Sequence, residues 1–406
     1  MAEEAKKNIG QSLILLQVLI LVAGLFYSNA LKSISLVTLS CSFLLFDNWK
    51  KNVKTILKNK LYISIILLVS IYIVSCFIST DKIQAFILIR NKISWLFIPI
   101  TLSLFDIDRR KLKIIIGFAT ILAITQALFA LFFLVKHYGE IGQLYATGNV
   151  LPVIKIHHVQ IAVLMAICVV VLVANFLNTN QKKEKIISIL VVLFLFLFLH
   201  IFAVRTGIIL MYAMLLCYLS WYYIQLKKWK IVWMSSISLV FLFFIFYQTS
   251  TNLKSKVDYM FYDIYQYTNQ TTTKHFYSDS RRLQSIKIGV DVLKKYPIFG
   301  TGVGDLYDEC AKRYQQQYPE LDKSYYFLPH CQYLYFLSAF GYLLGFLAIV
   351  CFVFPLYYFA KNQQMLLLSI YLACLLFAIW DAYIGTLFGT CLYVLIIGIG
   401  IKKRET

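Results

Sequence analysis

Charged side chains are scarce in this sequence. Only 14% of the 406 residues are Asp, Glu, Lys or Arg, while 60% are apolar. Soluble domains usually carry about 25% charged residues, so the composition excludes an ordinary soluble domain. It predicts a polytopic membrane protein. Only helices and closed barrels satisfy every backbone polar group in lipid, and apolar runs this long and continuous indicate an all-α fold.

Several other patterns are missing. The chain has no internal repeat, no low-complexity tract and no Cys–His spacing typical of a zinc site, although it contains nine cysteines. Most of the cysteines lie within apolar runs, where cysteine behaves as a small hydrophobe. Cys310 and Cys331 lie near the predicted outer face and could pair in an oxidising compartment. The first apolar run lacks a small-residue cleavage site, so we expect a retained helix rather than a signal peptide.

Acidic residues are few beside basic ones: 19 Asp and Glu against 39 Lys and Arg give a formal net charge of +20. A nucleic-acid-binding protein would gather this charge on one soluble face. Here it falls in short clusters at every second gap between apolar runs, which is the pattern of cytoplasmic loops. We therefore expect no nucleic-acid partner. The clusters are Lys50, Lys51, Lys54, Lys58 and Lys60; Arg109, Arg110, Lys111 and Lys113; Lys182, Lys183 and Lys185; Lys227, Lys228 and Lys230; and Lys402, Lys403 and Arg404.

The apolar runs predict about twelve transmembrane helices. The second and fourth are shorter than the ~20 residues that a straight span needs. An even number of spans places both termini on the cytoplasmic side. The predicted organisation is helices one to nine over 1–248, one large outer loop over 249–330, and helices ten to twelve over 331–406. The spans run over 11–30, 32–46, 61–79, 95–105, 114–136, 159–177, 186–204, 207–226, 231–248, 331–354, 365–380 and 386–401.

The long outer loop carries its own local signals. Apolar residues recur at helical spacing over 280–295, which predicts an amphipathic helix on the membrane surface. A glycine-rich turn follows at 300–305 and permits close approach of the backbone to a ligand. It is no nucleotide-binding fingerprint, since no strand precedes it. The favoured role of the nearby acids is to balance the basic residues of the loop; a metal site is the alternative for Asp305, Asp308 and Glu309.

Four of the arginines on the predicted outer face could bind a phosphate group. Arg205 interrupts an almost unbroken apolar stretch, where a cation needs an anion, a partner or water. It could bind phosphate, or it could snorkel to the lipid head groups. Arg281 and Arg282 begin the amphipathic helix and could hold a pyrophosphate or simply bind anionic lipid. Arg90, in the predicted outer loop 80–94, adds a further cation.

His330 lies where the long loop re-enters the membrane. A neutral imidazole could take the proton from a hydroxyl group near neutral pH, and the arginines could stabilise a departing diphosphate. The alternative is a histidine that merely begins a helix at the interface, which applies equally to His157 and His158. The presence of His330 and the arginines on one predicted face favours the catalytic interpretation.

Three stretches resemble the O-antigen ligase family. The segment FAVRTG at 202–207 is similar to the arginine-containing helix junction of that family. The arginine pair, amphipathic helix and Pro-x-x-Gly-x-Gly turn over 281–304 resemble its outer-loop pattern. The stretches PHCQYL at 329–334 and FGYLLG at 340–345 resemble its His-Asn-x-x-Leu stretch followed by a Gly-x-x-Gly helix. Cys331 occupies the usual asparagine position. The resemblance covers about 200–350; the rest is similar in topology.

The resemblance implies a metal-independent, cofactor-free glycosyltransferase of the bacterial inner membrane. Such an enzyme moves a glycan from undecaprenyl diphosphate to a sugar hydroxyl of lipid A–core on the periplasmic face, among membrane lipids. By position in the motifs, His330 resembles the general base. Arg205 and the pair Arg281 and Arg282 resemble the diphosphate-binding arginines, and Arg90 resembles a further basic contact.

Other functions stay open at this point. A polymerase of the same family would use a second lipid-linked repeat unit as the acceptor. A transporter of lipid-linked sugars would also suit twelve helices, but the chain lacks the internal repeat and the paired broken helices of many transporters. A structural scaffold would leave Arg205 unexplained.

Overall fold

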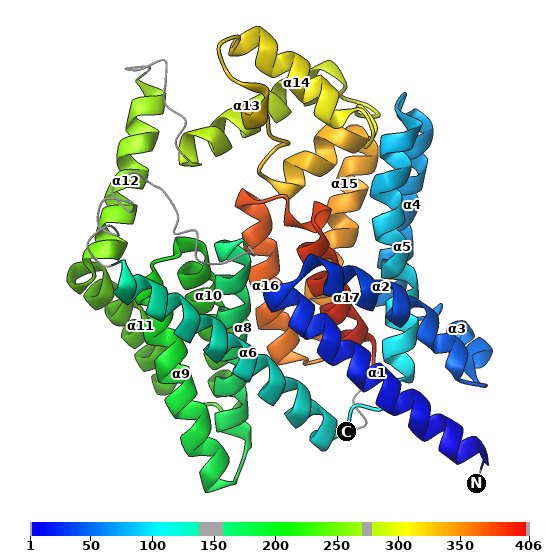
Figure 1. Cartoon of the computed structure of the whole chain (residues 1–406), viewed down its shortest axis with the longest axis vertical. Helices are drawn as coiled ribbons and strands as arrows, with labels where there is room; N and C mark the ends of the chain where they lie inside the picture. Colours follow the sequence, from blue (N-terminus) through cyan, green and yellow to red (C-terminus); the bar gives the residue numbers. More distant parts are fainter. Residues whose placement is uncertain (1, 138–156, 270–277, 403–406) are drawn as a thin grey trace.

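The computed structural model describes residues 2–137, 157–269 and 278–402, and every regular element in these ranges is a helix (Figure 1). The predicted all-α, polytopic fold is therefore confirmed. The elements are α1 (Ala2–Tyr27), α2 (Asn29–Cys41), η1 (Ser42–Leu45), α3 (Trp49–Ile56), α4 (Lys60–Ile78), α5 (Lys82–Leu104), α6 (Arg109–Lys136), α8 (His158–Asn178), α9 (Lys182–Phe202), α10 (Arg205–Gln225), α11 (Trp229–Thr249), α12 (Thr251–Thr268), α13 (Ser278–Lys295), α14 (Leu306–Gln317), η2 (Lys323–Tyr325), α15 (Gln332–Lys361), α16 (Met365–Trp380), η3 (Tyr383–Gly385) and α17 (Leu387–Ile401).

The predicted spans all fall on helices, but they differ in kind. In the described ranges, nine helices are long and apolar enough to cross a membrane. The second predicted span is instead a bent pair, in which α2 with η1 meets α3 at 112°. The last two, α16 and α17, are apolar but shorter. The expectation of twelve similar spans therefore needs correction at these three places.

The fourth span is much longer than predicted, and this moves Arg90. Asp81 caps α5 by accepting the backbone N–H of Gln84 at 2.9 Å, and the helix continues from Lys82 to Leu104. Ala85, Ile89 and Lys92 are buried at helical spacing. The first half mixes charged and apolar residues, so a search for continuous apolar residues misses it. Arg90 lies within this helix rather than in a loop, and its side chain is exposed.

The tenth span is broken at Gly341, whose φ of 71° and ψ of −178° interrupt α15. The two halves fold back on each other, because a Cβ at Gly345 would lie 2.8 Å from the carbonyl oxygen of Phe336. Residues 332–340 thus form a short helix beside the spanning part, 342–361. The break is held from outside by the glycine-rich turn: Tyr342 donates its N–H to the carbonyl of Pro297 at 2.7 Å.

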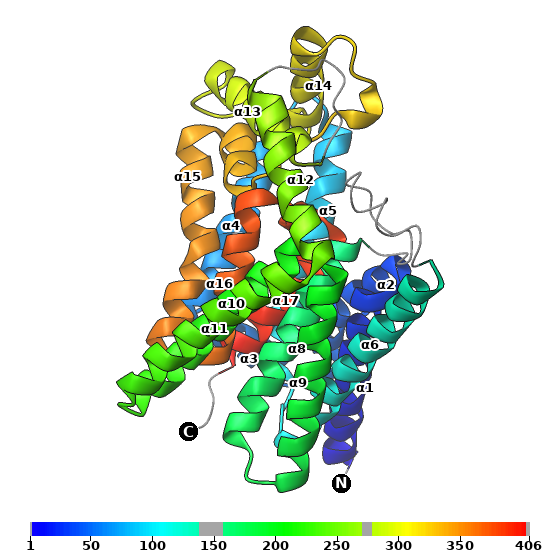
Figure 2. The same ribbon diagram turned by 90° about the vertical axis from the view of Figure 1, so that its left-hand side faces the viewer.

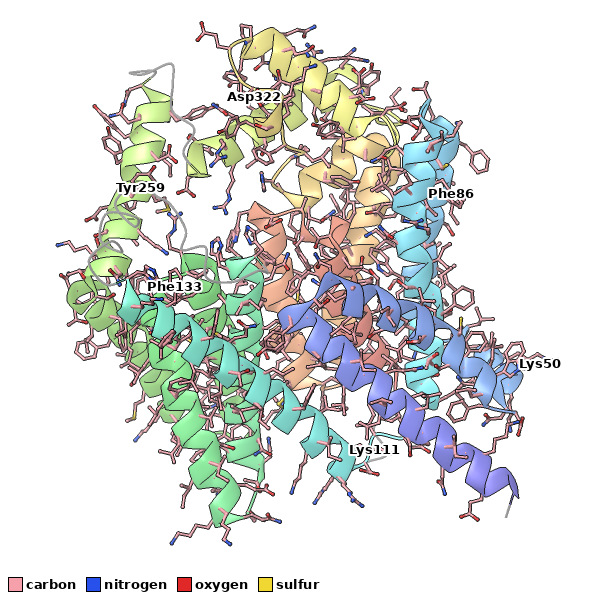
Figure 3. All side chains as sticks on the ribbon, in the orientation of Figure 1. Lys50, Phe86, Lys111, Phe133, Tyr259 and Asp322 are labelled. Carbon is pink, nitrogen blue, oxygen red and sulfur yellow. The ribbon has the colours of Figure 1, made fainter. Side chains whose placement is uncertain are left out.

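The two ends of the bundle differ in content. Both chain termini lie at one end, and α12, α13 and α14 lie at the other (Figures 1 and 2). Lys50 and Lys111 lie toward the terminal end, whereas Asp322 lies at the opposite end (Figure 3). In both ribbon views, adjoining ends of α8, α10, α16 and α17 lie below α13 and below the tips of α4 and α15.

Candidate functional site

Arg205 is the first residue of α10 and belongs to a partly buried ion-pair network. Helix α9 ends at Ala203, which has a left-handed φ of 51°, so the chain reverses abruptly before α10. The guanidinium Nη2 of Arg205 donates to Oδ2 of Asp279 at 2.8 Å. Nη1 is buried and has no hydrogen-bond partner among the residues described. Arg205 thus binds a carboxylate of α13 and keeps one buried donor that another anion could accept from.

Asp279 joins three helices. Its second oxygen accepts from Nη1 of Arg282 at 3.2 Å, and its side chain is only 12% exposed. The backbone N–H groups of Asp279 and Ser280 donate to the buried carboxylate of Asp263 on α12, at 3.0 and 2.9 Å. Asp263 therefore caps the N-terminus of α13 and fixes where its arginines lie. Helices α10, α12 and α13 are locked together by charge-assisted hydrogen bonds.

His330 lies beside this network on the segment that enters α15. Its backbone N–H donates to Oγ of Ser285 on α13 at 3.0 Å, and its ring packs against Phe327 with centroids 5.5 Å apart. Neither ring nitrogen has a hydrogen-bond partner in the described chain. Burial, followed by the charges of Arg282, Arg281 and His157, lowers the pKa of His330 to about 4. The imidazole is therefore neutral at pH 7 and can accept a proton.

The two neighbouring arginines of α13 point in different directions. Arg281 stacks over the rings of Tyr325 and Phe327, at 5.4 and 6.0 Å. Arg282 pairs with Asp279, and its charge acts on His330. Arg282 is thus the arginine that pairs with Asp279, while Arg281 lies against the rings of Tyr325 and Phe327. The charges of both arginines act on His330.

Two further charged residues belong to this site, and sequence patterns did not single them out. Burial, and then the charge of Arg205, lowers the pKa of Lys256 on α12 to about 7. Burial raises the pKa of Asp381, just after α16, to about 6, against the opposing charge of Arg282. Both residues looked like ordinary loop charges in the sequence. The sequence offers no specific signal for them, because neither residue lies near Arg205 along the chain.

The segment that carries Asp381 is braced from two sides. Nζ of Lys92 donates to the carbonyl of Ile384 at 2.5 Å, and the N–H of Ile384 donates to Oε1 of Gln332 at 3.2 Å. Lys92 is 2% exposed and lies over the ring of Trp95 at 4.4 Å. A chain of contacts thus connects α5, the 381–386 segment and the first residue of α15, two positions after His330.

Arg90 does not join this network. It lies on the exposed side of α5, and no contact of the described residues connects it to Arg205, Arg282 or His330. Its predicted role as a further phosphate contact stays a prediction.

The glycine-rich turn docks onto α4 and α5. Val303 and Gly304 donate their N–H groups to the hydroxyls of Ser75 and Ser79. The carboxylate of Asp305 accepts the backbone N–H groups of Thr80 and Asp81, at 2.6 and 2.8 Å. The turn therefore anchors the outer loop and needs its glycines, because a Cβ at Gly302 would meet Ser79 at 2.3 Å.

The acids proposed for a metal site have other partners. Glu309 binds Lys295 at 2.9 Å and Lys312 at 2.6 Å, which confirms its charge-balancing role. No acidic or Cys–His group that could hold a metal ion occurs in the ranges the structure covers. Cys310 and Cys331 are both free thiols, so the proposed pair is not formed.

These observations define a multi-pass membrane protein with a cationic, partly buried site beside an unprotonated histidine. Residues 189–350 match the family model described as O-antigen ligase, and they include Arg205, the α13 arginines and His330. This match confirms the resemblance seen in the motifs: over these residues the chain is O-antigen ligase-like. No curated protein matches the chain.

Proposed function

We propose that this protein transfers a glycan from undecaprenyl diphosphate to a sugar hydroxyl, with the site facing the periplasm from the bacterial inner membrane. The observation that carries the proposal is the partly buried Arg205–Asp279–Arg282 network beside the neutral His330. Further support comes from the clusters of basic residues near the termini, at the end opposite to α13, as expected for a cytoplasmic face.

The chemistry follows from the roles of these groups. The acceptor hydroxyl oxygen attacks the anomeric carbon of the donor glycan as the hydroxyl proton passes to the free nitrogen of His330. The bond between the anomeric carbon and the diphosphate oxygen breaks, and the leaving diphosphate takes the electron pair. Arg205 and Arg282 stabilise the charge that develops on it, with Arg281 at the rim. In this scheme the arginines supply the positive charge, and no cofactor or metal is required.

The acceptor divides the proposal into two branches. We favour a ligase, with a sugar of lipid A–core as the acceptor, over a polymerase that extends another lipid-linked repeat unit. Both branches use the same donor and the same base. Turnover of the purified protein with each acceptor in turn therefore distinguishes a ligase from a polymerase.

The test is turnover of a lipid-diphosphate-linked glycan by the purified protein in detergent. His330→Ala is expected to lower kcat by about 10²- to 10⁴-fold, the range of a general base. His137→Ala, at the end of α6, is the matched control and should leave turnover unchanged. Full turnover by His330→Ala would refute the base assignment. Absence of any covalent product from the wild-type protein would favour a transporter, since transport has no meaning in detergent.

A further inference from the structure

A small cavity lies beside the charged network. It has a volume of about 160 Å³ and is formed by the start of α8, the end of α16 and the 381–388 segment. Its polar lining includes Gln160 and Asp381, and its apolar lining includes Phe377 and Phe388. In the described part of the chain, the carboxylate of Asp381 and the amide of Gln160 make no hydrogen bond. These two groups are therefore available to a ligand that brings its own donors and acceptors.

The size and chemistry of the cavity limit what it can hold. A space of about 150 Å³ accepts one six-membered ring, so the cavity matches a single ring of a glycan. A diphosphate is disfavoured by the carboxylate of Asp381, and an isoprenoid chain would leave Asp381 and Gln160 buried without partners. A pyranose ring fits both requirements. Its hydroxyls can donate to Asp381 and exchange hydrogen bonds with Gln160, and its C–H face can pack against Phe377 and Phe388.

The cavity also lies near the proposed base. The charge of Arg282 acts on both Asp381 and His330, and His157, which lines the cavity, acts on His330 as well. Lys92 and Gln332 hold the segment behind Asp381 through Ile384. A ring in the cavity would thus be kept at a fixed place beside the reacting groups.

We propose that this cavity is a monosaccharide subsite, in which Asp381 and Gln160 bind the hydroxyls of one pyranose ring between Phe377 and Phe388. The inference rests on the proposed function for its biological meaning, because the ring would belong to the glycan donor or to the sugar acceptor. The binding event itself can be measured without turnover.

The first test is binding of single sugars to the full chain in detergent. Saturation-transfer NMR with glucose, galactose and N-acetylglucosamine is expected to give signals for at least one of them, with open-chain mannitol as the negative control. Gln160→Leu and Asp381→Ala should abolish the signals. His330→Ala should keep them, as should Gln84→Leu, a matched change on the exposed start of α5. No signal for any ring sugar, or signals unchanged in Gln160→Leu, would overturn the proposal.

The second test separates donor from acceptor. Loss of one neutral hydrogen bond in Gln160→Leu should raise one KM by about three- to tenfold while kcat is largely kept. An increase in the KM of the lipid-linked donor places the ring on the donor side; an increase in the KM of the acceptor places it on the other. A fall in kcat with both KM values unchanged would count against the subsite. Failure of the wild type to turn over would refute the proposed function, while sugar binding would still decide the subsite.

Discussion

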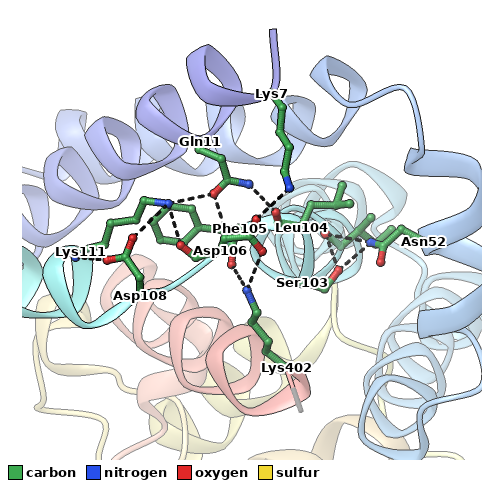
Figure 4. A network of polar contacts seen from close by, with 11 residues as sticks. Lys7, Gln11, Asn52, Ser103, Leu104, Phe105, Asp106, Asp108, Lys111 and Lys402 are labelled. Carbon is green, nitrogen blue, oxygen red and sulfur yellow. Dashed lines mark hydrogen bonds and ion pairs between the residues drawn. The ribbon is translucent and has the colours of Figure 1, made fainter. Parts of the chain in front are cut away.

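The ion pairs at the two ends of this molecule differ in the exposure of their carboxylates. At the terminal end, Lys7 and Lys402 both approach Asp106, at 3.4 and 3.2 Å, where Gln11 and Lys111 also meet the turn between α5 and α6 (Figure 4). The Asp106 side chain is 56% exposed. At the other end, the side chains of Arg205 and Asp279 are 23% and 12% exposed.

The comparison shows why the number of charges does not reveal a site. Exposed ion pairs are screened by water and contribute about 0–1 kcal/mol. A partly buried pair is less screened by water, so removal of one partner costs more than at an exposed pair. Basic residues are numerous at both ends of the chain's bundle, so pairing and partial burial, rather than number, distinguish Arg205 and Arg282 as groups with the means to bind a charged substrate.

Among the ion-pair residues of the two ends, substitution of Arg205 should have the largest effect on turnover. Arg205→Met should lower kcat by about 10²- to 10³-fold, as for loss of a group that stabilises developing charge, and should destabilise the fold by leaving Asp279 with a weaker set of partners. The double variant Arg205→Met with Asp279→Leu should recover much of the thermal stability but not the turnover. Recovery of both would show that the pair serves only the fold.

The pH dependence should report the depressed pKa of His330. The neutral form is the base, so its contribution to the rate should stay constant above about pH 5 and fall about tenfold per pH unit below the pKa near 4. Arg282→Leu removes a positive neighbour and should move this midpoint upward. Protonation of Asp381 near pH 6 should add a separate inflection that disappears in Asp381→Asn. A midpoint of 6.5 in the wild type would contradict the buried position of His330.

A moderate effect is expected from Lys92, which supports the site from a distance. Lys92→Met removes a charge-assisted hydrogen bond to Ile384, worth about 1.5–3 kcal/mol. We expect a higher KM for the sugar substrate, together with weaker thermal stability. Lys82→Met, which also loses hydrogen bonds to backbone carbonyls but lies exposed at the start of α5, is the matched control and should keep the wild-type KM. Equal KM values for the two variants would remove the positioning role.

The smallest effect should come from the terminal end. Lys113 and Glu184 form an exposed pair at 2.5 Å, with Lys113 53% exposed. Lys113→Met is expected to change the free energy of unfolding by no more than about 1 kcal/mol and to leave turnover unchanged. A loss of turnover comparable to that of Arg205→Met would abolish the contrast between the two ends.

Much of the fold was predictable because local patterns specify it. The amphipathic helix predicted over 280–295 is α13, and the apolar runs mark the helices of the bundle. The misjudged elements are those where tertiary contacts override local pattern. The first half of α5 mixes charged and apolar residues, and its burial of Ala85, Ile89 and Lys92 is set by the helices that pack against it. The break at Gly341 depends on a turn that lies forty residues earlier in the chain.

The sequence by itself determined that this chain is helical, enters the membrane, and carries an arginine and a histidine in O-antigen ligase-like motifs, because hydrophobic period and local motifs are properties of neighbouring residues. Only the tertiary structure decided which acids meet them. Asp279 reaches Arg205 across 74 positions, and Asp381 comes from a turn near the C-terminus. The interaction of two charges depends on the distance between them and on their burial, and the spacing of residues along the chain determines neither the distance nor the burial.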